Sequence, residues 1–228
     1  MRLNLDILAA WLPEQWRIKQ FGSGLRELTL ARPRLYEPGV AIQADTLYLT
    51  RAEMLPAAPP EVSCSFVCIG RKLPKPYLTA GLPILQLPDA VSLTEVYNRV
   101  QEIYDKFDTW DSHLRDELEK DVDFDIRQLL LLASGFLRRG VNVVDSNLQR
   151  LFSADFDPQT GASIIDQHGP MPMEHNERIK EVCPLERVIR EPYQTALDFD
   201  GRAYCKNLYV SDQFCGCISV NEFGRRFQ

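Results

Sequence analysis

The cysteines are the first residues in this chain whose chemistry could define a site. Two pairs are closely spaced, Cys64 with Cys68 and Cys215 with Cys217, and neighbouring thiolates can bind zinc or carry redox chemistry. Neither pair has the two-residue gap of a zinc knuckle, and an iron–sulfur cluster would need further converging thiolates, for which Cys205 is the one candidate. Both pairs lie in apolar, strand-like segments, where residues two or four apart share a face. We therefore expect reduced thiols in a core, with no metal site and no cofactor.

The histidines and carboxylates do not form a catalytic set either. His168 and His175 lie in a stretch of loop composition, where a histidine could ligate haem or metal, but a polar surface loop is the favoured interpretation. Asp198 and Asp200 precede a glycine, which is the composition of a hairpin turn. No segment has the Gly-x-Ser-x-Gly arrangement of a serine hydrolase. We expect no enzyme, and a thiol or hydrolase-type enzyme is the less favoured alternative.

The composition is that of a globular protein with two domains. The 228 residues suit two domains of about 100 residues each. A net charge of −6 and a pI near 5.2 argue against direct nucleic-acid binding, which needs a basic face. No apolar run is long enough to span a membrane, and the first residues lack the apolar core of a signal peptide. We expect a cytoplasmic protein without membrane contact.

The elements that would position a site are arranged around a long helix, predicted from Leu93 to Leu118. Its apolar residues recur at alternating steps of four and three, which is the seam spacing of a coiled coil. The residues of this stripe are Val96, Val100, Ile103, Phe107, Trp110 and Leu114. We expect the stripe to form the interface of a homodimer, within a linking segment at 91–119. The alternative is an ordinary helix that packs against its own domain.

The segment before this helix, 1–90, has the pattern of a small α/β domain. Strand formers at 46–50, a nearly continuous apolar run at 62–69 and a proline-bounded segment at 83–88 predict strands, and the apolar run indicates a strand buried on both faces. Buried strands joined by longer connections are typical of a mainly parallel sheet. We expect that sheet here.

The segment after the helix, 120–228, has a different order of predicted elements. They are a helix that begins at Ile126 and ends near Gly135 or Gly140, a hairpin at 141–152, short helical patches at 174–190, and strands at 193–197, 202–210 and 214–220. This order is the plan of a PAS or GAF sensory module, an α+β fold with an antiparallel sheet. A pocket between its sheet and helices would be lined by inward strand residues, for which Tyr193, Tyr204 and Cys215 are the candidates.

Five segments carry a resemblance to one protein family. They are ADTLYLTRAEML at 44–55, GLPILQLP at 81–88, VSLTEVYNRVQEI at 91–103, VNVVDSNLQRLFSAD at 141–155 and FCGCISVNE at 214–222. Through them the chain resembles the amino-terminal region of bacterial transcriptional regulators of the purine-catabolism-regulator (PucR-like) type. The resemblance implies a sensing role that controls a carboxy-terminal helix-turn-helix domain. That domain is missing from this sequence, so we expect the chain to be a fragment of a longer regulator.

We therefore expect the sensory and dimerisation region of a transcriptional regulator. It would bind a signal or metabolite as a small-molecule effector and pass on a change in helix packing. DNA would be contacted only through the missing helix-turn-helix domain. The alternative is a non-catalytic protein-interaction module that binds no small molecule.

Overall fold

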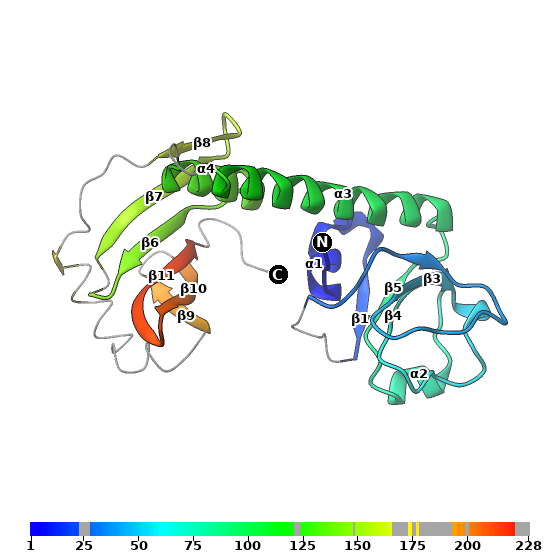
Figure 1. Cartoon of the computed structure of the whole chain (residues 1–228). Helices are drawn as coiled ribbons and strands as arrows, with labels where there is room; N and C mark the ends of the chain where they lie inside the picture. Colours follow the sequence, from blue (N-terminus) through cyan, green and yellow to red (C-terminus); the bar gives the residue numbers. More distant parts are fainter. Residues whose placement is uncertain are drawn as a thin grey trace. The chain divides into compact units, whose positions relative to one another are not determined.

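The computed structural model divides the chain into two units, each with its own sheet (Figure 1). The described residues are 1–22, 28–120, 124–147, 149–165, 173–174, 177, 193–198 and 201–221, with only the backbone described at 193–198, 201–204 and 221. Unit 1 is Met1–Asp111 and unit 2 is Ser112–Gln228. The boundary falls inside helix α3 (Leu93–Leu118), so this helix contributes residues to both units instead of forming a separate segment.

Unit 1 contains the mainly parallel sheet that its buried apolar runs predict. In the described residues the strand order is β1-β5-β4-β3-β2, where β2 to β5 run parallel and β1 pairs antiparallel with β5. The strands are β1 (Lys19–Phe21), β2 (Arg34–Leu35), β3 (Leu47–Arg51), β4 (Ser65–Ile69) and β5 (Ile84–Leu87). Every residue of β4 and β5 is buried, because a parallel sheet is covered on both faces.

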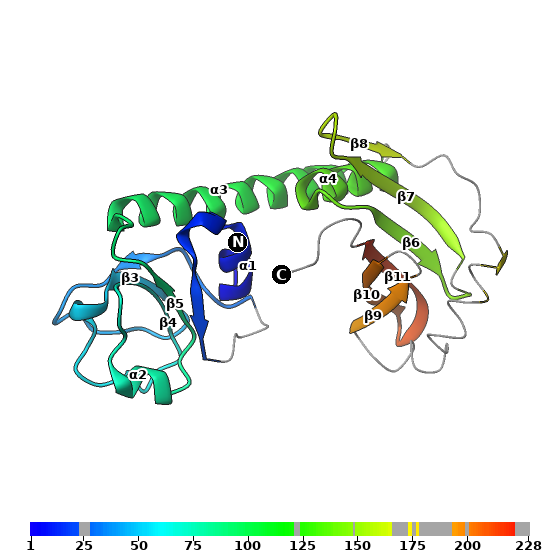
Figure 2. The same cartoon turned by 180° about the vertical axis from the view of Figure 1, so that it is seen from behind.

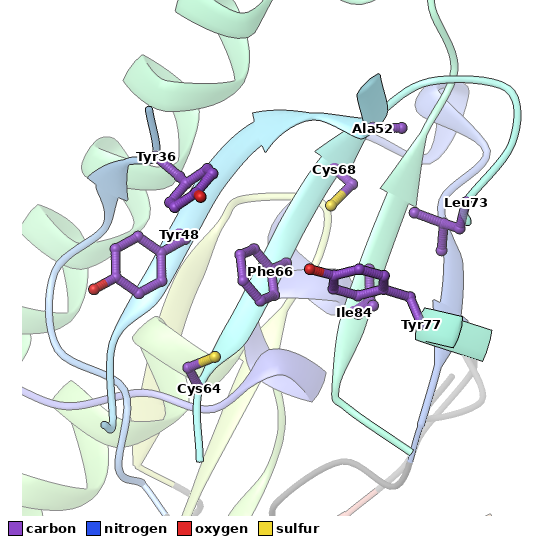
Figure 3. Close-up of a cluster of buried hydrophobic side chains, with 9 residues drawn as sticks. All are labelled: Tyr36, Tyr48, Ala52, Cys64, Phe66, Cys68, Leu73, Tyr77 and Ile84. Atoms are coloured by element: carbon purple, nitrogen blue, oxygen red, sulfur yellow. The ribbon is translucent and has the colours of Figure 1, made fainter. Parts of the chain in front are cut away.

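One face of this sheet carries a row of aromatic rings (Figure 3). The ring centroids of Tyr48 on β3 and Phe66 on β4 are 5.8 Å apart. Tyr77, from the short helix α2 (Lys75–Thr79), places its ring centroid 6.1 Å from that of Phe66. Its hydroxyl donates a hydrogen bond to the Pro56 carbonyl at 3.0 Å, which ties α2 to the connection between β3 and β4.

The first part of α3 packs against other elements of unit 1. Figures 1 and 2 show it beside α1 (Leu5–Trp11), where the ring centroids of Trp11 and Phe107 are 5.3 Å apart. The Arg32 guanidinium forms an ion pair with Asp105 of α3 at 2.8 Å. An apolar contact and an ionic contact therefore both hold this part of the helix on its own unit, as in the alternative interpretation of the sequence.

Unit 2 contains an antiparallel sheet with helix α4 (Ile126–Leu137) beside it (Figure 1). In the described residues the strand order is β8-β7-β6-β11-β10-β9. The strands are β6 (Val141–Asp145), β7 (Arg150–Asp157), β8 (Ala162–Ile165), β9 (Tyr193–Asp198), β10 (Gly201–Val210) and β11 (Gln213–Asn221). Helix α4 contacts β6, β7 and β8, and its Leu130 is buried in one cluster with Val141, Val143 and Ala154.

The predicted and observed elements differ mainly at the sheet edges. Strands β1, β2 and β8 lie at edges or have few residues, so they lack the apolar periodicity that identifies a strand. The stretch at 161–172 has loop composition, yet Ala162–Ile165 forms β8 because it pairs with the long strand β7. The chain is a mixed α/β protein with one mainly parallel and one antiparallel sheet. Among the described residues, no helix is both long and apolar enough to cross a membrane.

Candidate functional site

The sheet of unit 2 has one apolar face and one polar face. On β6, Val141 and Val143 pack in the cluster with α4, and Asn142 between them therefore lies on the opposite face. The same alternation places Ser153 of β7 and Ser219 of β11 on the face with Asn142. The face that does not contact α4 thus carries polar side chains at the centre of the sheet.

Three of these side chains lie side by side on neighbouring strands. Asn142 is paired in register with Ser153 on one side and with Ser219 on the other. The Ser153 hydroxyl donates to Asn142 Oδ1 at 2.6 Å, and Asn142 Nδ2 donates to the Ser219 hydroxyl oxygen at 3.4 Å. We call Ser153, Asn142 and Ser219 the polar row. Their exposed fractions are 4%, 8% and 9%, so all three are buried.

A buried polar row in the middle of a sheet needs a physical reason. A buried amide or hydroxyl without a partner costs on the order of 1–3 kcal/mol, a cost that valine or isoleucine at the same positions would avoid. The bonds within the row give each of its polar side-chain atoms one partner, and the remaining lone pairs and N–H or O–H groups are available to water or a ligand. Oriented polar groups in an otherwise buried site are typical of small-molecule binding.

Cysteine and amide side chains extend the polar face beyond the row. Cys205 of β10 pairs in register with Ser219, and Asn207 of β10 pairs with Cys217 of β11. Cys217 and Asn207 are buried and Cys205 is half-buried. Within the part of the chain that the structure describes, none of the buried side chains is of a charged type. The buried part of the face is therefore polar and uncharged, and the exposed Asp155 lies on the same face of β7 as Ser153.

The cysteines of unit 1 lie in the core instead of at a reactive site. Cys64 and Cys68 are buried beside the aromatic row (Figure 3). Burial raises the pKa of the Cys64 thiol to about 11 and that of the Cys68 thiol to about 12, because a thiolate is poorly solvated there. Both thiols are protonated at neutral pH and are poor nucleophiles. The described residues contain no cluster of three or more His, Cys, Asp or Glu side chains that could hold a metal ion.

The pocket residues predicted from the sequence lie on β9, β10 and β11, of which only β11 carries a residue of the polar row, and none of the three belongs to the row. Cys215 is exposed, and it lies on β11 two residues before the buried Cys217. Its Sγ is 3.3 Å from the backbone carbonyl oxygen of Gln213. Of the predicted pocket residues, Cys215 is thus placed at the exposed start of β11 and not on the buried part of the polar face.

Tyr193 and Tyr204 are placed by their backbone alone. Tyr193 pairs in register with Lys206, and Tyr204 pairs with Val220. Their side chains lie outside the described part of the structure. Strand pairing places both tyrosines in the half of the sheet that β9, β10 and β11 form.

Sequence reasoning missed the polar row, although one local signal was present. Asn142 interrupts the apolar stretch Val141–Val144, and a polar residue between apolar neighbours in a strand lies on the opposite face. The signal was too weak to stand alone, because an asparagine on a solvated strand face gives the same pattern. Its meaning depends on burial, which the pairing of three strands decides.

The residues predicted as a dimer seam divide into two groups along α3. Four buried residues belong to unit 1, namely Val96, Val100, Ile103 and Phe107. Trp110 and Leu114 are half-buried, and Leu118, one helical turn after Leu114, is 58% exposed. The same spacing that makes a coiled-coil seam also makes the buried face of a single helix, and the first group serves that second purpose. Only the later residues remain accessible to a partner.

Comparisons with known proteins give no family for the chain. No protein-family model matches it, and no curated protein matches it. One similar solved structure is an extracellular domain assigned to a histidine kinase, with a TM-score of 0.35, 11% identity, and coverage of 58% of this chain and 60% of the other. Another is a domain assigned to a sensory box/GGDEF family protein from Vibrio parahaemolyticus, with a TM-score of 0.33, 10% identity and 53% coverage of each chain. In both cases the match spans less than two thirds of the other chain, and the similarity is too weak to assign a fold family or a function.

Proposed function

We propose that the chain is the sensory region of a bacterial transcriptional regulator, in which unit 2 binds a small molecule on its polar sheet face. The observation that carries this proposal is the buried and hydrogen-bonded polar row of Ser153, Asn142 and Ser219. These groups are oriented by their strands, so a ligand would meet them without a cost of ordering the site.

The strand order of unit 2 supports a PAS- or GAF-like module. The first and last strands of the unit, β6 and β11, pair at the centre of the sheet, and the other strands extend outward on both sides. This arrangement is typical of such modules. Helix α4 covers one face with apolar contacts, so the two faces have different roles: one packs and the other can bind.

We propose further that α3 contributes to dimerisation through the residues that unit 1 does not bury. Leu114 and Leu118 lie one turn apart on the same side of the helix, and Leu118 is exposed. Helix α3 also joins the two units along the chain, so a change in its packing could pass a signal between them.

The cytoplasm is the proposed location, and DNA binding belongs to a separate helix-turn-helix domain, in agreement with this chain's net charge of −6.

The sensing role is tested by ligand-induced stabilisation. A library of cellular metabolites is screened by thermal shift against the whole chain, and we expect one chemical class to raise the unfolding temperature. The stabilisation is then measured for Ser153→Ala and for Ser163→Ala. Ser153 belongs to the polar row, whereas Ser163 lies on β8, where its Oγ is 3.0 Å from the position of an added Cβ on Gly135 of α4.

The two serine variants form a matched pair on the two faces of one sheet. We expect Ser153→Ala to reduce the ligand-induced shift and Ser163→Ala to leave it unchanged. A screen without any stabilising class, or equal losses in the two variants, would contradict ligand binding at the polar face.

A protein-interaction module is the second candidate, because large apolar side chains are exposed near the ends of α3 and α4. These are Leu118, Phe124 and Leu137. Sedimentation at micromolar concentration tests for a partner copy: the dimer hypothesis expects a dimer that Leu118→Glu weakens and that Leu137→Glu leaves intact. A monomeric wild type would remove dimerisation from the proposal. A dimeric wild type for which the metabolite screen finds no stabilising ligand would favour the interaction module.

A further inference from the structure

We infer that Asn142 recognises a small neutral molecule through an amide-type edge, in which a carbonyl oxygen and an N–H group lie side by side. This inference rests on the proposed sensing role of unit 2 and names the class of ligand. It follows from how the two serines of the polar row use the carboxamide of Asn142, and from the neutral character of the surrounding face.

The neighbouring strands occupy the two lateral sides of the Asn142 carboxamide. Ser153 on β7 and Ser219 on β11 are its register partners, so one serine lies on each side of it. Ser153 takes the oxygen side, by donating to Oδ1, and Ser219 takes the nitrogen side, by accepting from Nδ2. Both bonds connect neighbouring strands above the polar face of the sheet.

A carboxamide held in this way has further hydrogen-bonding groups on its outward edge, which is the edge that points away from the Cβ atom. An asparagine side chain can accept two hydrogen bonds at its oxygen and donate two from its nitrogen. One lone pair and one N–H of a planar amide point away from the Cβ atom and nearly parallel to each other. When the lateral sites serve Ser153 and Ser219, this outward pair presents one acceptor beside one donor. In the described part of the chain, the two serine bonds are the side-chain hydrogen bonds that Asn142 makes.

The outward edge adds hydrogen-bonding capacity to the one bond that each polar atom of Asn142 already makes. Asn142 is 8% exposed, and buried polar groups in native proteins nearly always have a partner from protein, water or ligand. The best complement to an acceptor beside a donor is a donor beside an acceptor, which is the edge of a primary amide or lactam. Asparagine uses the same paired geometry when it recognises a planar base edge.

The charge of the surroundings selects against an anionic ligand. The buried residues of the described chain include no charged side chain, so a carboxylate on this face would be desolvated without a counter-ion, and the exposed Asp155, on the same face of β7 as Ser153, would repel it. The serines add neutral capacity: the Ser219 hydroxyl accepts from Asn142 and keeps its proton for a ligand acceptor. A neutral amide therefore satisfies the site, and an anion does not.

The test observes the Asn142 carboxamide directly. In the nitrogen-labelled whole chain, the side-chain NH₂ signals of Asn142 are assigned by their loss in Asn142→Asp. Acetamide, pyrrolidinone and pyridone are then titrated as probes. The N-methyl derivatives of the two lactams serve as matched controls, since they keep the carbonyl and lose the donor. Acetate and benzoate test for anions.

We expect the three amides to shift the Asn142 signals and the N-methyl lactams to bind about tenfold more weakly, because one hydrogen bond is lost. In Asn142→Asp, lactam binding followed by the backbone signals of β6 and β11 falls by a similar factor. Asn147→Asp, the same change at an exposed turn position, leaves binding unchanged. The comparison of lactams with their N-methyl derivatives uses the wild-type chain alone, so it remains decisive if Asn142→Asp does not fold.

Three results would overturn the inference: no shift of the Asn142 signals with any amide, equal binding of the N-methyl lactams, or stronger shifts with the carboxylates. The last result, or a stabiliser of another class in the metabolite screen, would remove the amide class and leave the sensing role standing. If neither the screen nor these probes gives binding, both proposals fail together.

Discussion

Asn142 and Cys68 are both buried in the middle of a sheet, and their surroundings give them opposite chemistry. Cys68 lies among aromatic rings, where desolvation raises the pKa of its thiol to about 12 and keeps it neutral and unreactive. Asn142 lies between two hydroxyl groups that fix its orientation and leave polar capacity unused. Residue type alone would have favoured Cys68 over Asn142 as a functional group. The burial of Cys68 among aromatic rings and the hydrogen bonds of Asn142 favour Asn142 instead.

The raised pKa values of the unit 1 cysteines predict the order of alkylation. The thiolate is the form that reacts, so a pKa raised to about 11 for Cys64 and about 12 for Cys68 leaves almost no reactive form at pH 8, where both side chains are also buried. We expect iodoacetamide to modify the exposed Cys215 first in the folded protein. Mass spectrometry of peptides follows the three sites, with the same reaction in denaturant as the control. Modification of Cys64 or Cys68 as fast as Cys215 would revive a thiol enzyme.

At the scale of elements, α3 shows how one apolar stripe can serve two purposes. Its residues up to Asp111 lie in unit 1, where the Tyr104 hydroxyl donates to the Ala31 carbonyl at 2.9 Å and Arg99 forms an ion pair with Glu102 at 2.8 Å. The last turn carries the exposed Leu118. This end of the helix belongs to unit 2, and the dimer contact proposed for it is tested by Leu118→Glu.

The pairing of β6 with β11, which assembles the polar row, depends on a close backbone approach at Gly216. A Cβ atom on this residue would lie 2.1 Å from the Val144 carbonyl oxygen, and its φ of +149° is unfavourable for other residues. We expect Gly216→Ala to destabilise unit 2 by about 2–4 kcal/mol in urea unfolding. The control is Gly161→Ala, with a φ of +71° and no atom within 4 Å of the added Cβ, for which only about 1 kcal/mol of backbone strain is expected. Equal losses in the two variants would contradict a tight β6–β11 pairing.

At the scale of the whole molecule, each unit has its own core. Unit 1 buries the aromatic row and the first part of α3, whereas unit 2 buries Leu130 of α4 with its sheet. All three tryptophans, Trp11, Trp16 and Trp110, lie in unit 1. Tryptophan fluorescence therefore reports on one unit alone, while far-ultraviolet circular dichroism reports on both.

Separate cores predict two separable unfolding transitions. Ile103→Ala empties a buried site in unit 1 and should lower the stability seen by fluorescence by about 2–4 kcal/mol, because the removed atoms leave a cavity. Leu130→Ala makes a similar cavity in unit 2 and should shift the unfolding transition of that unit, which circular dichroism detects and tryptophan fluorescence does not. If each variant shifted both probes equally, the chain would unfold as one cooperative body.

The local patterns predicted the larger elements well. The long helix was expected from Leu93 to Leu118 and has those bounds, and the final three strands lie within a few residues of their expected ranges. Periodicity identifies such elements because a helix or strand that buries one face repeats its apolar residues locally. Short edge strands such as β1 and β8 lack this repeat, so their formation depends on the neighbour they pair with.

The sequence by itself determined the kinds of elements, their order and the mixed α/β character of the chain, since these follow from the periodicity of nearby residues. Only the tertiary structure decided that the first part of the α3 stripe covers its own unit, and that Ser153, Asn142 and Ser219 meet in one buried row. The physical reason is separation along the chain: Asn142 and Ser219 are 77 residues apart and become neighbours only when the first and last strands of unit 2 pair. Burial and strand pairing give Asn142 a fixed orientation, and both are properties of the folded sheet.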